Sequence, residues 1–281
     1  MRIGEVEVAI IDVITFIGII ITFLTGVFNL FQNKKSLYIN NITKFRVIWI
    51  TTLRGHIANL KELSNITNLY IITKDGTNKI AYRRELEKNV SLIRMYLDFT
   101  SKFDIQLITK IEELKEIINS YLLIYYCRNT IKSVDNDDEL VTKFYEVVDV
   151  ISEKKVLIEL LNIAVNNKKI QRTTEIKDLN LLDLRNNAKV AYMDDCVLIR
   201  EIIKQSDYII NDWENEIGKL NKHIEDIVQI YLKAEWIRCK IETRMWPFNR
   251  YNEEKVVSKL QKELLLANNM KLYMSFQLVF S

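Results

Sequence analysis

Basic and aromatic side chains gather at two places in the chain, and together these residue types can bind a negatively charged ligand that carries flat rings. The first group is Tyr82, Arg83, Arg84, Lys88, Arg94 and Tyr96. The second group is Trp236, Arg238, Lys240, Arg244, Trp246, Phe248, Arg250 and Tyr251. Cations neutralise phosphates while aromatic rings stack on bases, so a nucleotide or a short oligonucleotide suits both groups. Packed aromatic rings beside solvated charges give the same pattern; our candidate ligand-binding residues are Arg238, Arg244 and Trp246.

Residue patterns typical of catalysis and of metal binding are missing from the sequence. His56 and His223 have no neighbours at ligand spacing, and there is no H-E-x-x-H, G-x-S-x-G or glycine-rich phosphate loop. Acidic clusters such as Asp194–Asp195 fit the solvated face of a helix. We therefore expect no enzymatic activity, no cofactor and no metal ion.

A third set of residues places small and polar side chains at regular intervals near the N-terminus. Its members are Asp12, Thr15, Gly18, Thr22, Thr25 and Asn29, and from Thr15 onward they recur at steps of three and four. A seven-residue repeat matches left-handed packing of helices around one another. Two interpretations remain open: a contact between copies through small residues, or a pore lined by rings of Thr and Asn. In the second, Asp12 and Glu5 lie at the outer mouth and favour cations.

The element that carries these residues is the segment 13–33, which contains 21 residues without a charge. A helix of this length covers about 30 Å, the thickness of the hydrocarbon core of a bilayer. The acidic start of the chain, with Glu5 and Glu7, and the lack of a small-residue cleavage site argue against a secretory signal. We predict a single membrane-spanning helix; a buried core helix is the alternative.

The charges after this segment predict its orientation. Lys34, Lys35, Lys44 and Arg46 follow it, and no acidic residue lies between Asp12 and Glu62. By the positive-inside rule, the N-terminus faces out and the rest of the chain is cytoplasmic, at the bacterial inner membrane. The three cysteines lie far apart in apolar contexts, so we expect buried free thiols and no disulfide.

Composition favours an all-α fold. The 281 residues include only six Gly and one Pro, too few for a sheet-rich protein with many tight turns. The net charge is +3, so no overall field attracts nucleic acid. We expect a bundle of long helices below the membrane.

We divide the chain into residues 1–33, the N-terminal segment with the spanning helix, 34–64, a basic amphipathic juxtamembrane helix, and 65–281, a cytoplasmic helical domain. The juxtamembrane helix either rests on anionic lipid or packs against protein. Residues 64–79 form a break, either a hairpin around Asp75–Gly76 or a loop. Helices are then predicted for the ranges 80–100, 102–126, 139–166, 178–244 and 252–270. A coiled-coil-like apolar seam begins at Trp213 and includes Arg238, which either pairs with Glu or lines a site.

The spanning segment, followed by Asn33-Lys-Lys and then by the stretch from Tyr38 through Arg46 and Trp49 to Arg54, resembles small single-pass membrane proteins of low-GC bacteria. Several of these are membrane-disrupting effectors in phage-defence operons, and the layout is similar to the transmembrane effector of the Hailong defence system. The resemblance implies an oligomer whose N-terminal helices form an ion channel. It also implies a nucleotidyltransferase from the same operon, whose short oligodeoxyadenylate holds the channel shut.

From these observations we expect an oligomeric membrane effector with a channel formed by its N-terminal helices and a cytoplasmic domain that senses a negatively charged ligand. The alternative is a non-conducting, membrane-anchored scaffold that recruits a cytoplasmic partner.

Overall fold

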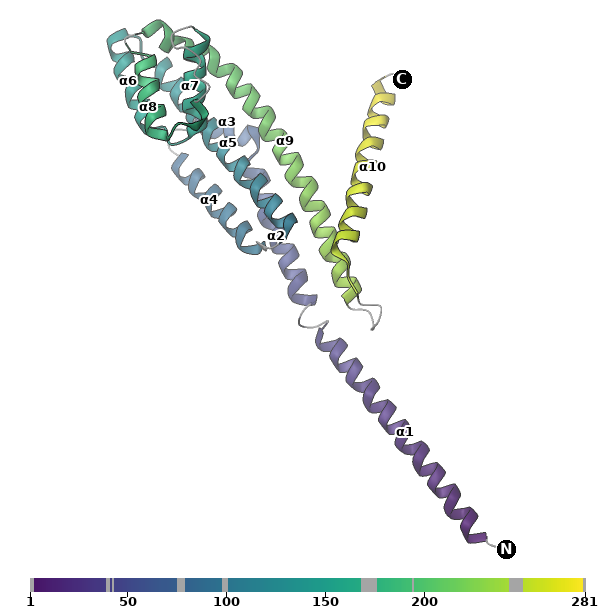
Figure 1. Ribbon diagram of the computed structural model, residues 1–281. Helices are drawn as coiled ribbons and strands as arrows, with labels where there is room; N and C mark the ends of the chain where they lie inside the picture. Colours follow the sequence, from purple (N-terminus) through teal and green to yellow (C-terminus); the bar gives the residue numbers. More distant parts are fainter. Residues whose placement is uncertain are drawn as a thin grey trace. The chain divides into compact units, whose positions relative to one another are not determined.

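The computed structural model describes residues 3–38, 41, 43–74, 79–97, 101–167, 176–193, 195–242 and 250–279; the side chains of 3–11, 38, 177 and 268–279 lie outside this description. The described residues form helices and connecting turns, with no strand (Figure 1). The all-α prediction is confirmed. The chain divides into two compact units, one of residues 1–52 and 230–281 and the other of residues 53–229.

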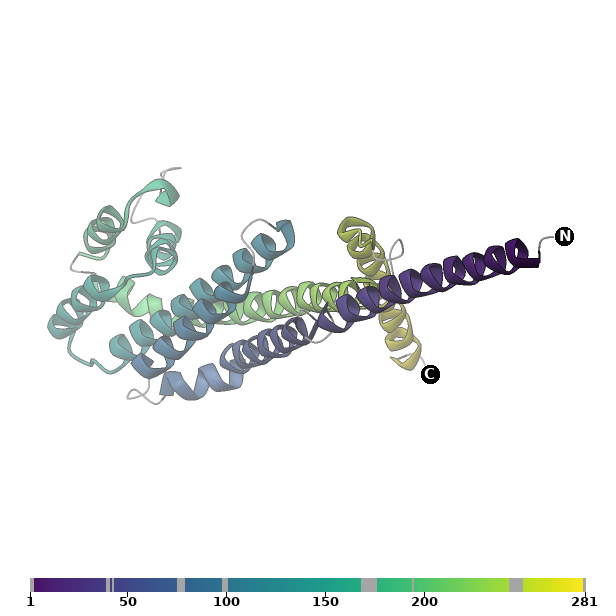
Figure 2. The ribbon, with the colours of Figure 1, turned by 90° about the horizontal axis from the view of Figure 1, so that it is seen from below.

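The first unit contains the long helix α1 (Ile3–Tyr38), which Figure 2 shows as one unbroken rod. Within the described residues, one helix segment is long and apolar enough to cross a membrane: Asp12–Leu37, near the N-terminus. No part of this segment is buried in the structure. The core helix of a soluble protein is mostly buried, whereas this segment is uncovered in the structure.

The same unit contains the beginning of α2 (Lys44–Leu63), the end of α9 (Cys196–Glu242) and α10 (Glu253–Val279). Val257 and Leu260 of α10 are buried. Lys233 of α9 forms an ion pair with Glu263 of α10 at 3.1 Å. These contacts attach α10 to the end of α9.

The second unit is a helical bundle built around α5 (Lys102–Lys132), which packs against α3 (Ile66–Lys74), α4 (Lys79–Tyr96), α6 (Asp137–Val150) and α7 (Lys154–Asn166). After a short 3₁₀ turn (Ile176–Asp178), α8 (Leu181–Ala191) packs on α6 and α7. The earlier part of α9 belongs to this unit and buries Trp213, Ile217 and Ile224. The start of the predicted seam therefore packs within the chain.

Side-chain caps fix several helix starts. Asn180 accepts a hydrogen bond from the backbone N–H of Asp183 at 2.9 Å, and Asn136 accepts one from Asp138 at 3.0 Å. Such caps satisfy backbone donors that have no partner within the helix. Asp137, Asp138 and Glu139 lie in the first turn of α6, where their negative charges complement the positive end of the helix dipole.

The prediction of one helix over 178–244 is wrong, because the chain breaks between α8 and α9. Tyr192 ends α8 with its buried phenol donating to the carbonyl of Leu160 at 2.6 Å. Asp195 then caps α9, accepting from the N–H of Leu198 at 2.8 Å. The sequence has no Gly or Pro at this turn, and the apolar residues keep their helical spacing across it, so the break could not be recognised from the sequence.

Two other predicted boundaries also change. The helix expected over 139–166 is two helices, α6 and α7, separated at Ile151, whose backbone is extended. Arg185 donates two hydrogen bonds to the Ile151 carbonyl, at 2.7 and 3.1 Å, so this carbonyl has donors although it is not part of a helix. The segment offered as the first strand of a hairpin is helical, as α3, while the proposed turn at Asp75–Gly76 lies outside the described residues.

Candidate functional site

The six candidate pore-lining residues, Asp12, Thr15, Gly18, Thr22, Thr25 and Asn29, all lie on α1 and are all exposed. The hydroxyl of Thr22 donates to the carbonyl of Gly18 at 2.8 Å, and that of Thr25 donates to Ile21 at 2.8 Å. Such bonds lower the cost of placing threonine in an apolar environment. A methyl group at Gly18 would meet no atom within 4 Å, so this face is open.

The rest of α1 exposes a continuous apolar surface. Phe16, Phe23 and Leu30 are 64%, 68% and 70% exposed, and other apolar side chains of the segment are similar. A contiguous apolar patch of this length marks a surface that meets lipid or another protein. α1 therefore offers two faces, one apolar and one of small and polar residues.

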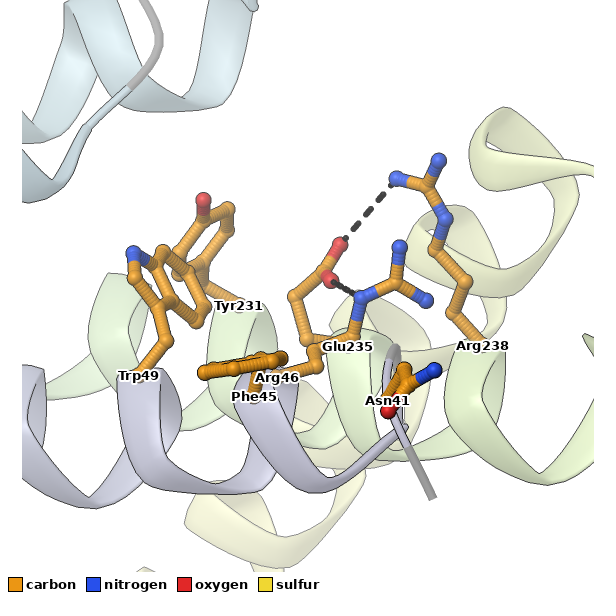
Figure 3. A pocket seen from close by; sticks show the side chains of 7 residues that line it. All are labelled: Asn41, Phe45, Arg46, Trp49, Tyr231, Glu235 and Arg238. Atoms are coloured by element: carbon orange, nitrogen blue, oxygen red, sulfur yellow. Dashed lines mark hydrogen bonds and ion pairs between the residues drawn. The ribbon is translucent and has the colours of Figure 1, made fainter. Parts of the chain in front are cut away.

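A second site is a groove of about 500 Å³ at the meeting of α2 and α9, within the first unit. The side chains that line it are Asn41, Phe45, Arg46, Trp49, Tyr231, Glu235 and Arg238. Figure 3 shows the carboxylate of Glu235 facing both arginines, with Trp49 and Tyr231 at one end of the groove and Arg238 and Asn41 at the other. The groove thus combines aromatic faces with both signs of charge.

Four charges form a network at this groove. Arg238 Nε donates to Glu242 at 2.9 Å, and Arg46 also donates to Glu242. Glu235 is held more loosely, with Arg46 at 3.6 Å and Arg238 at 3.5 Å. Hydrogen bonds of N–H to oxygen are usually 2.7–3.2 Å, so the contacts to Glu235 are weak while those to Glu242 are strong. The four charges sum to zero.

Burial changes the proton affinity of these groups. It raises the pKa of Glu235 from its ordinary value, and the charges of Arg238 and Arg46 offset part of this rise. Burial also lowers the pKa of Arg46, but the hydrogen bond and charge of Glu242 outweigh it, and the pKa is raised overall. Both arginines stay charged at any ordinary pH. Glu235 is therefore a desolvated carboxylate whose positive neighbours stand at long distance.

Aromatic rings line the other end of the groove. Trp49 and Tyr231 meet edge to face, with centroids 5.8 Å apart. Phe45 lies in the groove with 70% of its side chain exposed. Aromatic faces attract cations, so the end of the groove with Trp49, Tyr231 and Phe45 favours a positively charged group. At the opposite end, the guanidinium of Arg238 lies 5.5 Å from the ring centre of Tyr251.

The structure places one of the three predicted ligand-binding residues in the groove. Arg238 lines it and pairs with Glu235 and Glu242, so both alternatives given for this residue hold together. Arg244 and Trp246 lie outside the described residues. Glu235 and Trp49 were missed as site residues, although glutamates three before and four after Arg238 are a recognisable helical pattern.

Three residues of the first basic and aromatic group, Tyr82, Arg83 and Arg94, have partners within the chain. Tyr82 is buried and donates to the carbonyl of Leu63 at 2.7 Å. Arg83 and Arg94 pair with glutamates, Glu153 at 3.4 Å and Glu112 at 3.1 Å. These contacts fit packed rings beside paired charges.

Among the residues that the structure describes, no three His, Cys, Asp or Glu side chains gather in a way that would hold a metal ion. Comparison with protein-family models, with curated proteins and with solved structures finds no match to this chain. Its function is therefore inferred from the groove and from the two faces of α1.

Proposed function

We propose that this chain is an oligomeric membrane protein whose α1 helices assemble in the bilayer and form an ion-conducting bundle. The observation that carries the proposal is the uncovered apolar length of Asp12–Leu37. Lipid covers the face with Phe16 and Phe23, and neighbouring copies meet along the face with Gly18 and Thr22. Each copy supplies one such helix among its described residues, so a conduit needs several copies.

The polar stripe supports conduction more specifically than the apolar length does. Polar groups facing lipid are costly, and α1 places Thr15, Thr22 and Asn29 on one side at seven-residue intervals. In a bundle these residues form successive rings that face the axis. Asp12 adds an acidic ring at the outer mouth, which favours cations.

The basic residues after α1 support a cytoplasmic location for the second unit. The resemblance to defence effectors supports a role in which the loss of membrane potential stops an infected cell. A short oligonucleotide made by a nucleotidyltransferase from the same operon is the ligand that this resemblance implies. In this proposal the ligand acts on the helices of the second unit.

A planar bilayer containing the purified full chain tests the channel. We expect conductance steps that Thr22→Leu abolishes. Leucine is larger and apolar, so it would narrow the pore at the ring of Thr22 side chains and exclude water from it. The matched change Phe23→Leu alters the neighbouring lipid-facing residue and should leave conductance unchanged. Absence of conductance in the unmodified chain, at a protein density that gives inserted oligomers, contradicts the channel.

A membrane-anchored scaffold is the second candidate function, and one observation favours it. The hydroxyls of Thr22 and Thr25 are both satisfied within α1, so the stripe can pack against another helix without water. In that case the same bilayer experiment shows no conductance, while the chain still inserts and forms oligomers.

A further inference from the structure

The groove between α2 and α9 lies close to the end of the spanning segment along the chain. Asn41 is four residues after Leu37, the last residue of the apolar segment. Four extended residues reach about 14 Å at most. The headgroup layer extends about 5–8 Å beyond the hydrocarbon core on each side. If α1 spans the bilayer, the groove opens at or just beyond the lipid headgroups.

The charges of the groove decide which headgroup it fits. From the sequence, Arg46 belongs to a basic helix face that would attract anionic lipid. In the structure, Glu242 and Glu235 neutralise Arg46, and Lys61 of the same helix forms an ion pair with Glu225 at 3.0 Å. The described charges of the groove, Arg46, Arg238, Glu235 and Glu242, sum to zero and so have little attraction for a net anion. The groove does offer separate places for a positive and a negative group.

The positive group has a defined place. Glu235 lines the groove and its side chain is 14% exposed; the cations that the structure describes beside it, Arg238 and Arg46, are 3.5 and 3.6 Å away. Glu235 lies between the two arginines on one side and the aromatic end formed by Trp49, Tyr231 and Phe45 on the other (Figure 3). A carboxylate whose described contacts with cations are long, beside aromatic faces, is suited to an ammonium group.

The negative group has a place at the other end. Arg238 lines the groove, and its side chain is 36% exposed, more than that of Arg46. A guanidinium has five N–H donors, so Arg238 can bind a phosphate oxygen and keep a contact with Glu242. Asn41 lies on the same side in Figure 3 and adds an amide.

We propose that this groove binds the zwitterionic headgroup of a membrane phospholipid, with the ammonium at Glu235 and the aromatic rings and the phosphodiester at Arg238. The proposal rests on the membrane insertion of α1 proposed above. The bound lipid would hold the start of α2 against α9 at the membrane surface, directly after the spanning helix.

The test uses the purified full chain in a mild detergent, titrated with phosphatidylethanolamine or with phosphatidylglycerol and followed by native mass spectrometry. We expect phosphatidylethanolamine to bind at least about tenfold more tightly than phosphatidylglycerol. We expect phosphorylethanolamine, the headgroup without acyl chains, to compete only weakly. Equal binding of the two lipids, or equally tight binding of phosphorylethanolamine, overturns the proposal.

Two pairs of variants assign the lipid to the groove. Glu235→Gln keeps the size of the side chain but removes its charge, and should weaken phosphatidylethanolamine binding about tenfold. Glu263→Gln removes a carboxylate that pairs with Lys233 outside the groove, and should change nothing. Phe45→Ala should also weaken binding, whereas Ile48→Ala, on the same helix with a 51% exposed side chain that does not line the groove, should not. Because Phe45 and Ile48 are both exposed, neither change threatens the fold.

Flotation with lipid vesicles separates this proposal from the function on which it rests. If the chain fails to float with vesicles of either lipid, the membrane proposal fails and the lipid site fails with it. If the chain floats but Glu235→Gln and Phe45→Ala bind phosphatidylethanolamine like the unmodified chain, the headgroup site alone is wrong.

Discussion

Arg46 and Glu235 lie 3.6 Å apart and join the first turn of α2 to the last part of α9. Arg46 also binds Glu242, so one guanidinium connects the residues that follow the spanning segment to two carboxylates almost 200 positions later in the sequence. The side chain of Arg46 is only 20% exposed. This cluster is a charged contact between the start and the end of the first unit.

Replacing Arg46 by glutamine should loosen this contact. The change leaves Glu235 and Glu242 close together with Arg238 as their remaining described cation, and breaking such a partly buried pair costs about 1–3 kcal/mol. Hydrogen–deuterium exchange of the full chain should quicken about ten- to hundredfold in peptides covering 44–52 and 230–242. Lys61→Gln breaks the exposed pair with Glu225 and should cost about 1 kcal/mol or less. Unchanged exchange in the Arg46 variant would show that the network does not hold α2 in place.

The cysteines should differ in reactivity. Cys127 is fully buried, and burial raises its pKa to about 12; burial also raises the pKa of the buried Cys239. Cys196 is partly exposed, with a pKa raised first by burial and then by Asp137. The thiolate is the reactive form, so iodoacetamide at neutral pH should modify Cys196 slowly and the other two only after unfolding. Rapid labelling of Cys127 in the native chain, read by mass spectrometry, would contradict the bundle.

Buried tyrosines predict a loss of stability at alkaline pH. Burial raises the pKa of Tyr82 and of Tyr192 above the ordinary value. The folded state therefore keeps these phenol protons after the unfolded chain, which ionises near pH 10, has lost them. Their contribution is complete below about pH 10 and is lost as the pH rises beyond it.

This prediction is checked by measuring urea unfolding of the full chain as a function of pH. Stability should fall above about pH 10, and Tyr82→Phe with Tyr192→Phe should make the fall shallower. The double variant also loses two hydrogen bonds, at a cost of about 1–2 kcal/mol each at neutral pH. Tyr208→Phe, at a position 74% exposed, serves as the control and should keep the original slope. An identical alkaline slope in the double variant would refute the assignment.

Much of the fold could be predicted from the sequence because helices repeat their apolar residues locally. The apolar seam from Trp213 to Ile227 is buried as its spacing indicated, and α1 follows directly from its uncharged length. The breaks at Ile151 and Tyr192 could not be predicted, because contacts with distant residues cause them: Arg185 takes the carbonyl of Ile151, and Tyr192 reaches Leu160. Tertiary hydrogen bonds of this kind leave no local pattern.

The candidate site was predicted only in part for the same reason. Arg238 was recognisable by its neighbours in the sequence, but the groove also needs Arg46 and Trp49 from a segment far away in the chain. The sequence showed Arg46 as one of several cations on a basic helix face. The sequence did not show that Glu235 and Glu242 neutralise Arg46. This neutralisation is the reason why we propose a zwitterionic headgroup for the groove and not an anionic one.

Disulfide cross-linking in membranes tests the central claim most directly, that α1 crosses the bilayer and meets its copies along the small and polar face. The full chain with Cys196→Ser would carry one added cysteine, Thr22→Cys or Phe23→Cys, which lie about 100° apart on the helix. On oxidation, we predict that Thr22→Cys gives covalent dimers in the membrane fraction and that Phe23→Cys stays monomeric. Equal cross-linking at both positions, or recovery of the chain in the soluble fraction, would contradict the account.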